Sequence, residues 1–183
     1  MVDIRALQVD DADALARMHV GVWRAAYGHL LPAAALDGVD LADSAQRWRR
    51  SARGEVEPPR SVLVADDDGT IVGFVAFGAP REDVPPGTGE VLALYVVEPR
   101  WGSDLGHRLL AAARRSLRES GYDRLYLWVL EDNPRARGFY ERAGLTYDGT
   151  RKMIDFLGCD LPELRYAGPA AFVSDQERAH STT

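Results

Sequence analysis

The chain has 183 residues, of which 46% are hydrophobic and 27% charged, and its formal net charge is −6. This size suits one globular domain with its own hydrophobic core. No run of about 18 apolar residues occurs, which argues against a membrane span, and the acidic balance argues against sequence-independent nucleic-acid binding. A single cysteine excludes an internal disulfide and a cysteine-based zinc site. The four histidines match no ligand motif, so we expect no metal. The N-terminus lacks the pattern of a signal peptide, so we expect a cytoplasmic protein.

The first half of the chain predicts one strand, three helices and a hairpin. An acidic run, Asp10 to Asp13, favours a helix start, and apolar residues then recur at helical spacing. Aspartates and a glycine at 66–69 separate two apolar runs, as in a β-hairpin. The expected elements are a strand at 2–7, helices at 10–27, after Pro32 and at 41–53, and hairpin strands at 61–65 and 70–78.

The second half predicts strands that alternate with helices. A proline- and glycine-rich loop at 79–89 precedes a strongly apolar strand at 90–97. The remaining expected elements are a helix to about 120, a strand at 124–130, a helix from Asn133 to Gly144, and strands near 145–153 and 162–166. We therefore expect an α/β (α+β) fold whose mixed, mostly antiparallel central sheet is flanked by helices. A single domain is expected over 1–167, followed by a mobile tail at 168–183.

The connection at 101–106 carries the clearest chemical signal. A buried strand leads through a glycine turn into a helix, and free N–H groups at a helix start attract anions. Gly102 permits a backbone conformation that side chains hinder, and Gly106 lets a ligand or a neighbouring strand come close. Such turns also occur without a ligand, so the turn alone indicates a phosphate site without establishing one.

Several motifs together resemble the GCN5-related N-acetyltransferase superfamily, over about residues 2–167. They are the Trp23-Arg24-Ala25-Ala26-Tyr27 segment, the Leu-Tyr-Val-x-x-Pro strand, the glycine turn, and Asn133-Pro134-x-Ala136-x-x-Phe139-Tyr140-x-x-x-Gly144. The resemblance implies the acyl-CoA N-acyltransferase fold, a bacterial small-molecule or peptide acetyltransferase, acetyl-CoA as donor and an amine as acceptor. It also makes a homodimer a mild preference.

The resemblance further implies roles for particular residues. A β-bulge at 94–96 would offer the backbone of Leu94 and Val96 to the pantetheine amides, and the following turn would hold the pyrophosphate. Asn133 would contact the cofactor, and Tyr140 would lie near the sulfur and protonate the leaving thiolate. The residues implied for the turn are Trp101, Gly102, Ser103, Asp104, Leu105, Gly106 and His107.

An acceptor amine must lose a proton before it attacks a thioester. Glu90, at the start of its strand, is the first candidate base, although a surface carboxylate explains it equally well. Glu131 is a second candidate, and a chain of water molecules is a third possibility. Trp23 and Tyr27 lie four residues apart on one helix face and would border the acceptor site, unless they serve only as core packing.

Asp104 departs from the family pattern, which has glycine at this position. Its charge would repel the pyrophosphate and lower donor affinity by roughly ten- to a thousandfold. Ser103 or Asp104 would alternatively cap the helix and occupy its amides. In an intermediate case Asp104 points to solvent and the amides still face the ligand. The self-capped case implies a non-catalytic acyl-CoA-binding or sensor module as an alternative to the enzyme.

Overall fold

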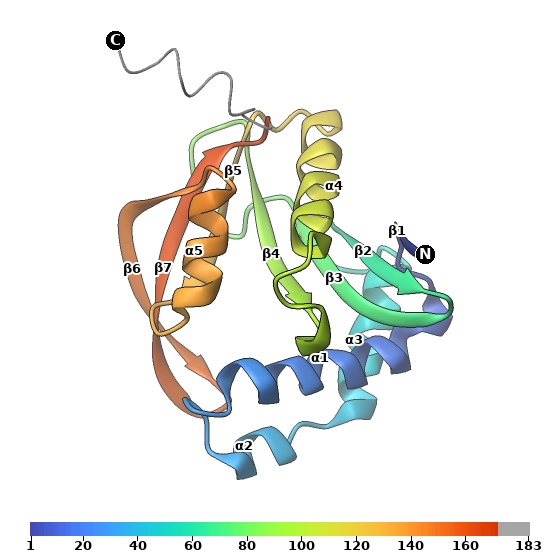
Figure 1. Ribbon diagram of the computed structural model, residues 1–183. Helices are drawn as coiled ribbons and strands as arrows, with labels where there is room; N and C mark the ends of the chain where they lie inside the picture. The colour runs from blue at the N-terminus through green and yellow to red at the C-terminus, as the bar shows by residue number, and fades with distance from the viewer. Residues whose placement is uncertain (172–183) are drawn as a thin grey trace.

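The computed structural model describes residues 1–171, which form a seven-stranded sheet with helices on both faces (Figure 1). The strand order is β1-β2-β3-β4-β5-β7-β6, and β4–β5 is the parallel pair in it. The mixed, mostly antiparallel sheet is the predicted fold class. In chain order the elements are β1 (Val2–Ala6), η1 (Val9–Asp11), α1 (Ala12–Tyr27), α2 (Ala33–Asp37), α3 (Leu41–Ala52), β2 (Arg60–Asp67), β3 (Thr70–Gly78), β4 (Thr88–Val96), η2 (Glu98–Arg100), α4 (Leu105–Glu119), β5 (Arg124–Leu130), α5 (Pro134–Arg142), β6 (Thr146–Phe156) and β7 (Cys159–Pro169).

The last two strands are longer than the sequence predicts. β6 continues to Phe156, and β7 continues to Pro169, past the expected domain limit at 167. Ala170 is buried, so the folded part of the chain extends beyond that limit. The rest of the expected mobile tail, residues 172–183, lies outside the described residues. Within residues 1–171, no helix is long and apolar enough to cross a membrane.

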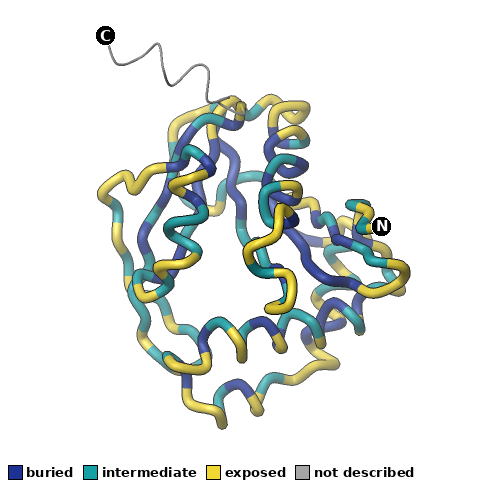
Figure 2. The backbone as a smooth tube through the Cα atoms, viewed as in Figure 1, coloured by how far each residue is buried: buried dark blue, intermediate teal, exposed yellow. Residues whose placement is uncertain are grey.

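The two faces of the sheet carry different hydrophobic clusters. Side chains alternate along β5, so Leu127 and Val129 pack in the cluster with α4 and α5, whereas Leu130 packs beside Tyr27 of α1. Figure 1 shows α4 and α5 in front of the sheet, with α1 along its lower edge. Figure 2 shows β4 and β5 buried along much of their length in the middle of the molecule. The central strands are therefore covered from both sides.

β4 and β5 separate part of the way along the sheet. Their pairing covers residues 88–91 and stops there. Opposite β3, Ala93 pairs with Ala76 and Val91 with Phe77, which leaves Leu92 as the extra residue of a β-bulge. The bulge expected at 94–96 therefore lies at Leu92. Beyond it, the β4 edge that faces β5 has no strand partner among residues 1–171, and an opening between the two strands results.

Candidate active site

A cavity of about 660 Å³ lies at this opening and is lined by residues from both faces of the sheet. That volume is in the usual range for small-molecule sites. Two halves can be distinguished. The first, called here the turn half, is lined by the β4–α4 connection and α5. The second, the aromatic half, is lined by α1, β4 to β7 and the aromatic side chains that they carry.

The turn half has the backbone geometry that an anion site requires. Gly102 has φ +80°, a conformation that side chains disfavour, and it turns the chain into α4. Ser103 Oγ accepts a hydrogen bond from the Leu105 amide at 3.3 Å and donates to the Arg100 carbonyl at 2.7 Å. The amides of Gly106 and His107 form no hydrogen bond within residues 1–171. Two donors at the helix start are thus free for a ligand.

Asp104 does not cap the helix that follows it. Its backbone is helical, its side chain accepts no capping hydrogen bond, and it is exposed. The self-capped arrangement is therefore wrong for Asp104, and the structure has the intermediate case. Solvent screens an exposed carboxylate, so we now expect a repulsion of the pyrophosphate weaker than the predicted ten- to thousandfold effect.

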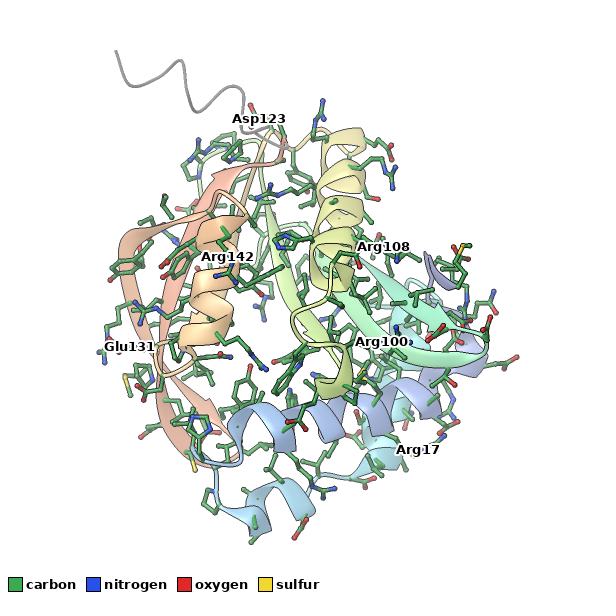
Figure 3. All side chains as sticks on the ribbon, viewed as in Figure 1. Arg17, Arg100, Arg108, Asp123, Glu131 and Arg142 are labelled. Carbon is green, nitrogen blue, oxygen red and sulfur yellow. The ribbon has the colours of Figure 1, made fainter. Side chains whose placement is uncertain are left out.

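Three arginines line the same half and oppose the charge of Asp104. Arg100 precedes the turn, while Arg135 and Arg142 lie on α5. Figure 3 labels Arg100 and Arg142 on the two sides of the opening. The Arg135 guanidinium lies 3.1 Å from the centre of the Trp101 ring, and the Trp101 indole N–H donates to the Val96 carbonyl at 2.7 Å. Arg100 is already paired with Asp67, so Arg135 and Arg142 supply the positive charge that exceeds the charge of Asp104 in this half.

Helix α5 is fixed against the turn by local contacts. Asn133 Oδ1 accepts a hydrogen bond from the Ala136 amide at 3.1 Å and caps the helix. A Cβ at Gly106 would lie 3.3 Å from the Phe139 ring, so this glycine admits a neighbouring helix and not the expected strand. The His107 ring packs on Phe139 with ring centres 4.8 Å apart.

Tyr140 follows Phe139 and lies where the two halves meet. The residue is 7% exposed, and its side chain lines the cavity. Its hydroxyl forms no hydrogen bond with another residue in the described range. Burial raises the pKa of Tyr140 above the usual tyrosine value, and the neighbouring Tyr27 adds to the effect. The hydroxyl is therefore protonated at neutral pH and free to donate.

The aromatic half contains few charges. Tyr27, Tyr95 and Trp128 line it, and the hydroxyls of Tyr27 and Tyr95 lie 3.3 Å apart. The Trp128 indole nitrogen is buried without a hydrogen-bond partner within residues 1–171. Glu163 of β7 lines this half as well. Sequence reasoning missed Glu163, because Asp160 and Arg165 in the same late strand are charged as well and no local pattern distinguishes Glu163 from them.

Neither of the expected base candidates lines the cavity. Glu90 is 1% exposed, and its carboxylate accepts hydrogen bonds from the Arg81 backbone amide at 3.0 Å and from the Arg81 guanidinium at 2.6 Å. Glu131 pairs with Arg151 at 2.9 Å and lies away from the opening in Figure 3. The position of Glu90 does not support the expected role of base, because its carboxylate lies outside the cavity lining and is engaged in an internal ion pair.

Two further expected contacts are not observed. Trp23 packs edge-on against Phe156 and on the His19 ring, and it does not line the cavity, whereas Tyr27 does. Leu105 is buried in the core, and its amide bonds to Ser103. The other expected residues line the cavity: Leu94, Val96, Trp101, Gly102, Ser103, Asp104, Gly106, His107, Asn133 and Tyr140. No group of three His, Cys, Asp or Glu in the described chain is placed to hold a metal.

Comparisons with known proteins agree with this geometry. The family model described as "Acetyltransferase (GNAT) family" matches residues 23–145. The chain is 32% identical over 136 residues to the uncharacterized N-acetyltransferase YuaI of Bacillus subtilis, covering 73% of this chain and 75% of that protein. It is 29% identical to a probable N-acetyltransferase of Mycobacterium tuberculosis, Rv2775, over 90% and 92% of the two chains. A PaiA N-acetyltransferase from Thermoplasma acidophilum, solved with coenzyme A, has the same fold with a TM-score of 0.69, at 20% identity over 90% of this chain and 98% of that one.

Proposed function

Because the chain belongs to the acetyltransferase (GNAT) family and is an N-acetyltransferase, we propose that it transfers the acetyl group of acetyl-CoA to a primary amine of a small molecule or peptide. The observation that carries the proposal is one continuous cavity. It joins the free amides at the start of α4 to the free hydroxyl of Tyr140, and then opens to the other face of the sheet. A donor and an acceptor can thus approach Tyr140 from opposite sides.

The turn half supplies groups suited to the donor. The Gly106 and His107 amides, at the positive end of the α4 dipole, would bind the pyrophosphate, with Arg142 adding positive charge. The unpaired edge of β4 would pair with the pantetheine amides, as another strand would. The Val96 carbonyl already accepts from Trp101, so Leu94 offers the freer backbone groups on this edge.

The proposed reaction is direct attack of a neutral amine on the thioester. The amine nitrogen forms a bond to the carbonyl carbon, and the carbon–sulfur bond then breaks. The leaving sulfur takes a proton from the Tyr140 hydroxyl, and the attacking nitrogen loses one proton, which restores the Tyr140 hydroxyl. A buried phenol beside the reacting atoms suits this role, because it stays protonated until negative charge develops on sulfur.

The alternative, a non-catalytic sensor module, rested on Asp104. Asp104 is exposed and caps nothing, and the Gly106 and His107 amides remain available, which favours the enzyme over that alternative. The homodimer and the cytoplasmic location stay predictions.

The proposed function is tested by supplying acetyl-CoA with three amine classes: phenethylamine, spermidine and an alanine-initiated peptide. Thiol release above the no-acceptor rate, together with an acetylated amine in the mass spectrum, is the expected result for at least one class. A failure of all three, with thiol release equal to the no-acceptor control, would contradict the proposal.

A further inference from the structure

Glu163 is the one charged residue among the described side chains that line the aromatic half. It pairs across the sheet with Leu130, so its side chain lies on the same face as Leu130, next to Tyr27. The other charged lining residues, Arg100, Asp104, Arg135 and Arg142, come from the β4–α4 connection or from α5. A single carboxylate thus stands alone at the end of the cavity that faces away from the turn.

This carboxylate has no hydrogen-bond or ion-pair partner in the described chain, although Lys152 and Arg81 lie near enough to attract its charge. Glu163 forms neither a hydrogen bond nor an ion pair there, although Lys152 lies directly opposite it on β6. Lys152 instead pairs with Glu82 at 2.7 Å and lies over the Trp128 ring at 3.8 Å. An unpaired carboxylate in a partly buried site costs free energy, which is the usual sign of a group kept for a ligand.

The surroundings of Glu163 are apolar and aromatic. Tyr27, Tyr95, Trp128 and Phe156 line this half, together with Leu130 and Ile154. Aromatic side chains pack well against a flat apolar ligand, and the faces of their rings attract a nearby cation through cation–π interactions. No cationic side chain of the described residues lines this half, and Lys152 and Arg81, which act on Glu163, lie outside the lining, so a carboxylate on the acceptor would face the charge of Glu163 first.

From this arrangement we propose that Glu163 binds the ammonium group of the acceptor, and that the acceptor is a primary amine carried on an aromatic or flat apolar skeleton. The inference deepens the proposed function and rests on it. Glu163 accepts one proton of the bound ammonium and passes it to solvent, which leaves a neutral amine for the attack described above. Polyamines fit less well, because they carry several positive charges and the single carboxylate of Glu163 can pair with only one of them.

Binding measurements test this inference separately from catalysis. Phenethylamine and its neutral analogue 2-phenylethanol are titrated into the full chain, with and without CoA. Phenethylamine is expected to bind about ten- to a hundredfold more tightly, the range for a hydrogen bond to a charged group. In Glu163→Gln that ratio is expected to fall to near one.

Two control variants separate the charge of Glu163 from its packing. Glu163→Asp keeps the charge and should keep most of the preference, whereas Glu131→Gln removes a carboxylate outside the cavity and should keep all of it. A ratio near one in the unaltered protein, or a ratio unchanged in Glu163→Gln, would overturn the inference. The absence of CoA binding would instead count against the proposed function, so the two failures are distinguishable.

Discussion

The two halves of the cavity differ in how they handle charge. The turn half combines two free amides with Arg100, Arg135 and Arg142 against one exposed acid, Asp104. The aromatic half has one unpaired acid, Glu163, among aromatic rings. A site for an anionic donor and a site for a cationic acceptor thus share one cavity, and Tyr140 lies at their junction. The comparison shows that the net charge of −6 says little about the charge of either ligand, because the groups next to each binding site determine the local electric field.

The largest expected effect is at the junction. Tyr140→Phe removes the proton donor and keeps the ring, so turnover should fall by about a hundred- to ten-thousandfold. Acetyl-CoA affinity should change little. Steady-state kinetics and calorimetry measure the two separately, and a variant with normal turnover would exclude Tyr140 as the acid.

The next effect concerns Glu90, a buried carboxylate outside the cavity lining. Glu90→Gln breaks the ion pair with Arg81 and should destabilise the fold by about 2 kcal/mol. Turnover per folded molecule should be unaffected, because Glu90 does not line the cavity. Chemical denaturation together with kinetics gives both quantities. Full stability combined with lost turnover would restore Glu90 as a catalytic candidate.

A smaller effect is expected at Asp104. Asp104→Gly should tighten acetyl-CoA binding about three- to fivefold, because the removed charge is exposed and screened. The same change should slightly weaken α4, since an acid near a helix start is favourable. Calorimetric titration measures the affinity of both proteins for acetyl-CoA. Weaker binding in the variant would show that Asp104 helps to hold the donor.

The smallest effect concerns the stability cost of Glu163. Burial raises the pKa of its carboxyl, so the folded state binds this proton more tightly than the unfolded state does. The charged form therefore lowers stability above that pKa, and Glu163→Gln should gain between zero and about 1 kcal/mol at neutral pH. The gain should vanish as the pH falls below the ordinary glutamate pKa. A clear loss of stability in denaturant melts at neutral pH would mean that Glu163 has a structural role.

Binding of the acceptor amine should also depend on the charge of Glu163. It should weaken as the pH falls and the carboxylate takes up its proton. The preference for phenethylamine over 2-phenylethanol needs charged Glu163, so it should decline as the pH falls, starting at a higher pH than for an exposed glutamate. The charged groups around Glu163 are Lys152 on β6, Arg81 and Glu82 before β4, and Glu90 on β4, and the hydroxyl of Tyr27 on α1 also faces it. A preference that is flat from neutral to acidic pH would assign the charge recognition elsewhere.

The sequence predicts the turn half well and the aromatic half poorly. Gly102, the turn and the Asn133 cap depend on residues close together in the chain, so their local patterns carry the information. The neighbours of Glu90 and Glu163 depend instead on strand register and on the β3–β4 loop. Arg81 reaches Glu90 from the β3–β4 connection, and Glu163 meets Tyr27 only because β7 lies beside β5. The bulge at Leu92 is likewise a property of strand pairing.

Titration of the full chain with acetyl-CoA in a calorimeter tests the central claim most directly. If the turn half is a donor site, binding is saturable, with one acetyl-CoA per chain and a dissociation constant below about 1 mM. An Arg142→Ala variant then binds more weakly, because a cation facing the donor is lost. The absence of any heat of binding at about 1 mM acetyl-CoA would contradict the account.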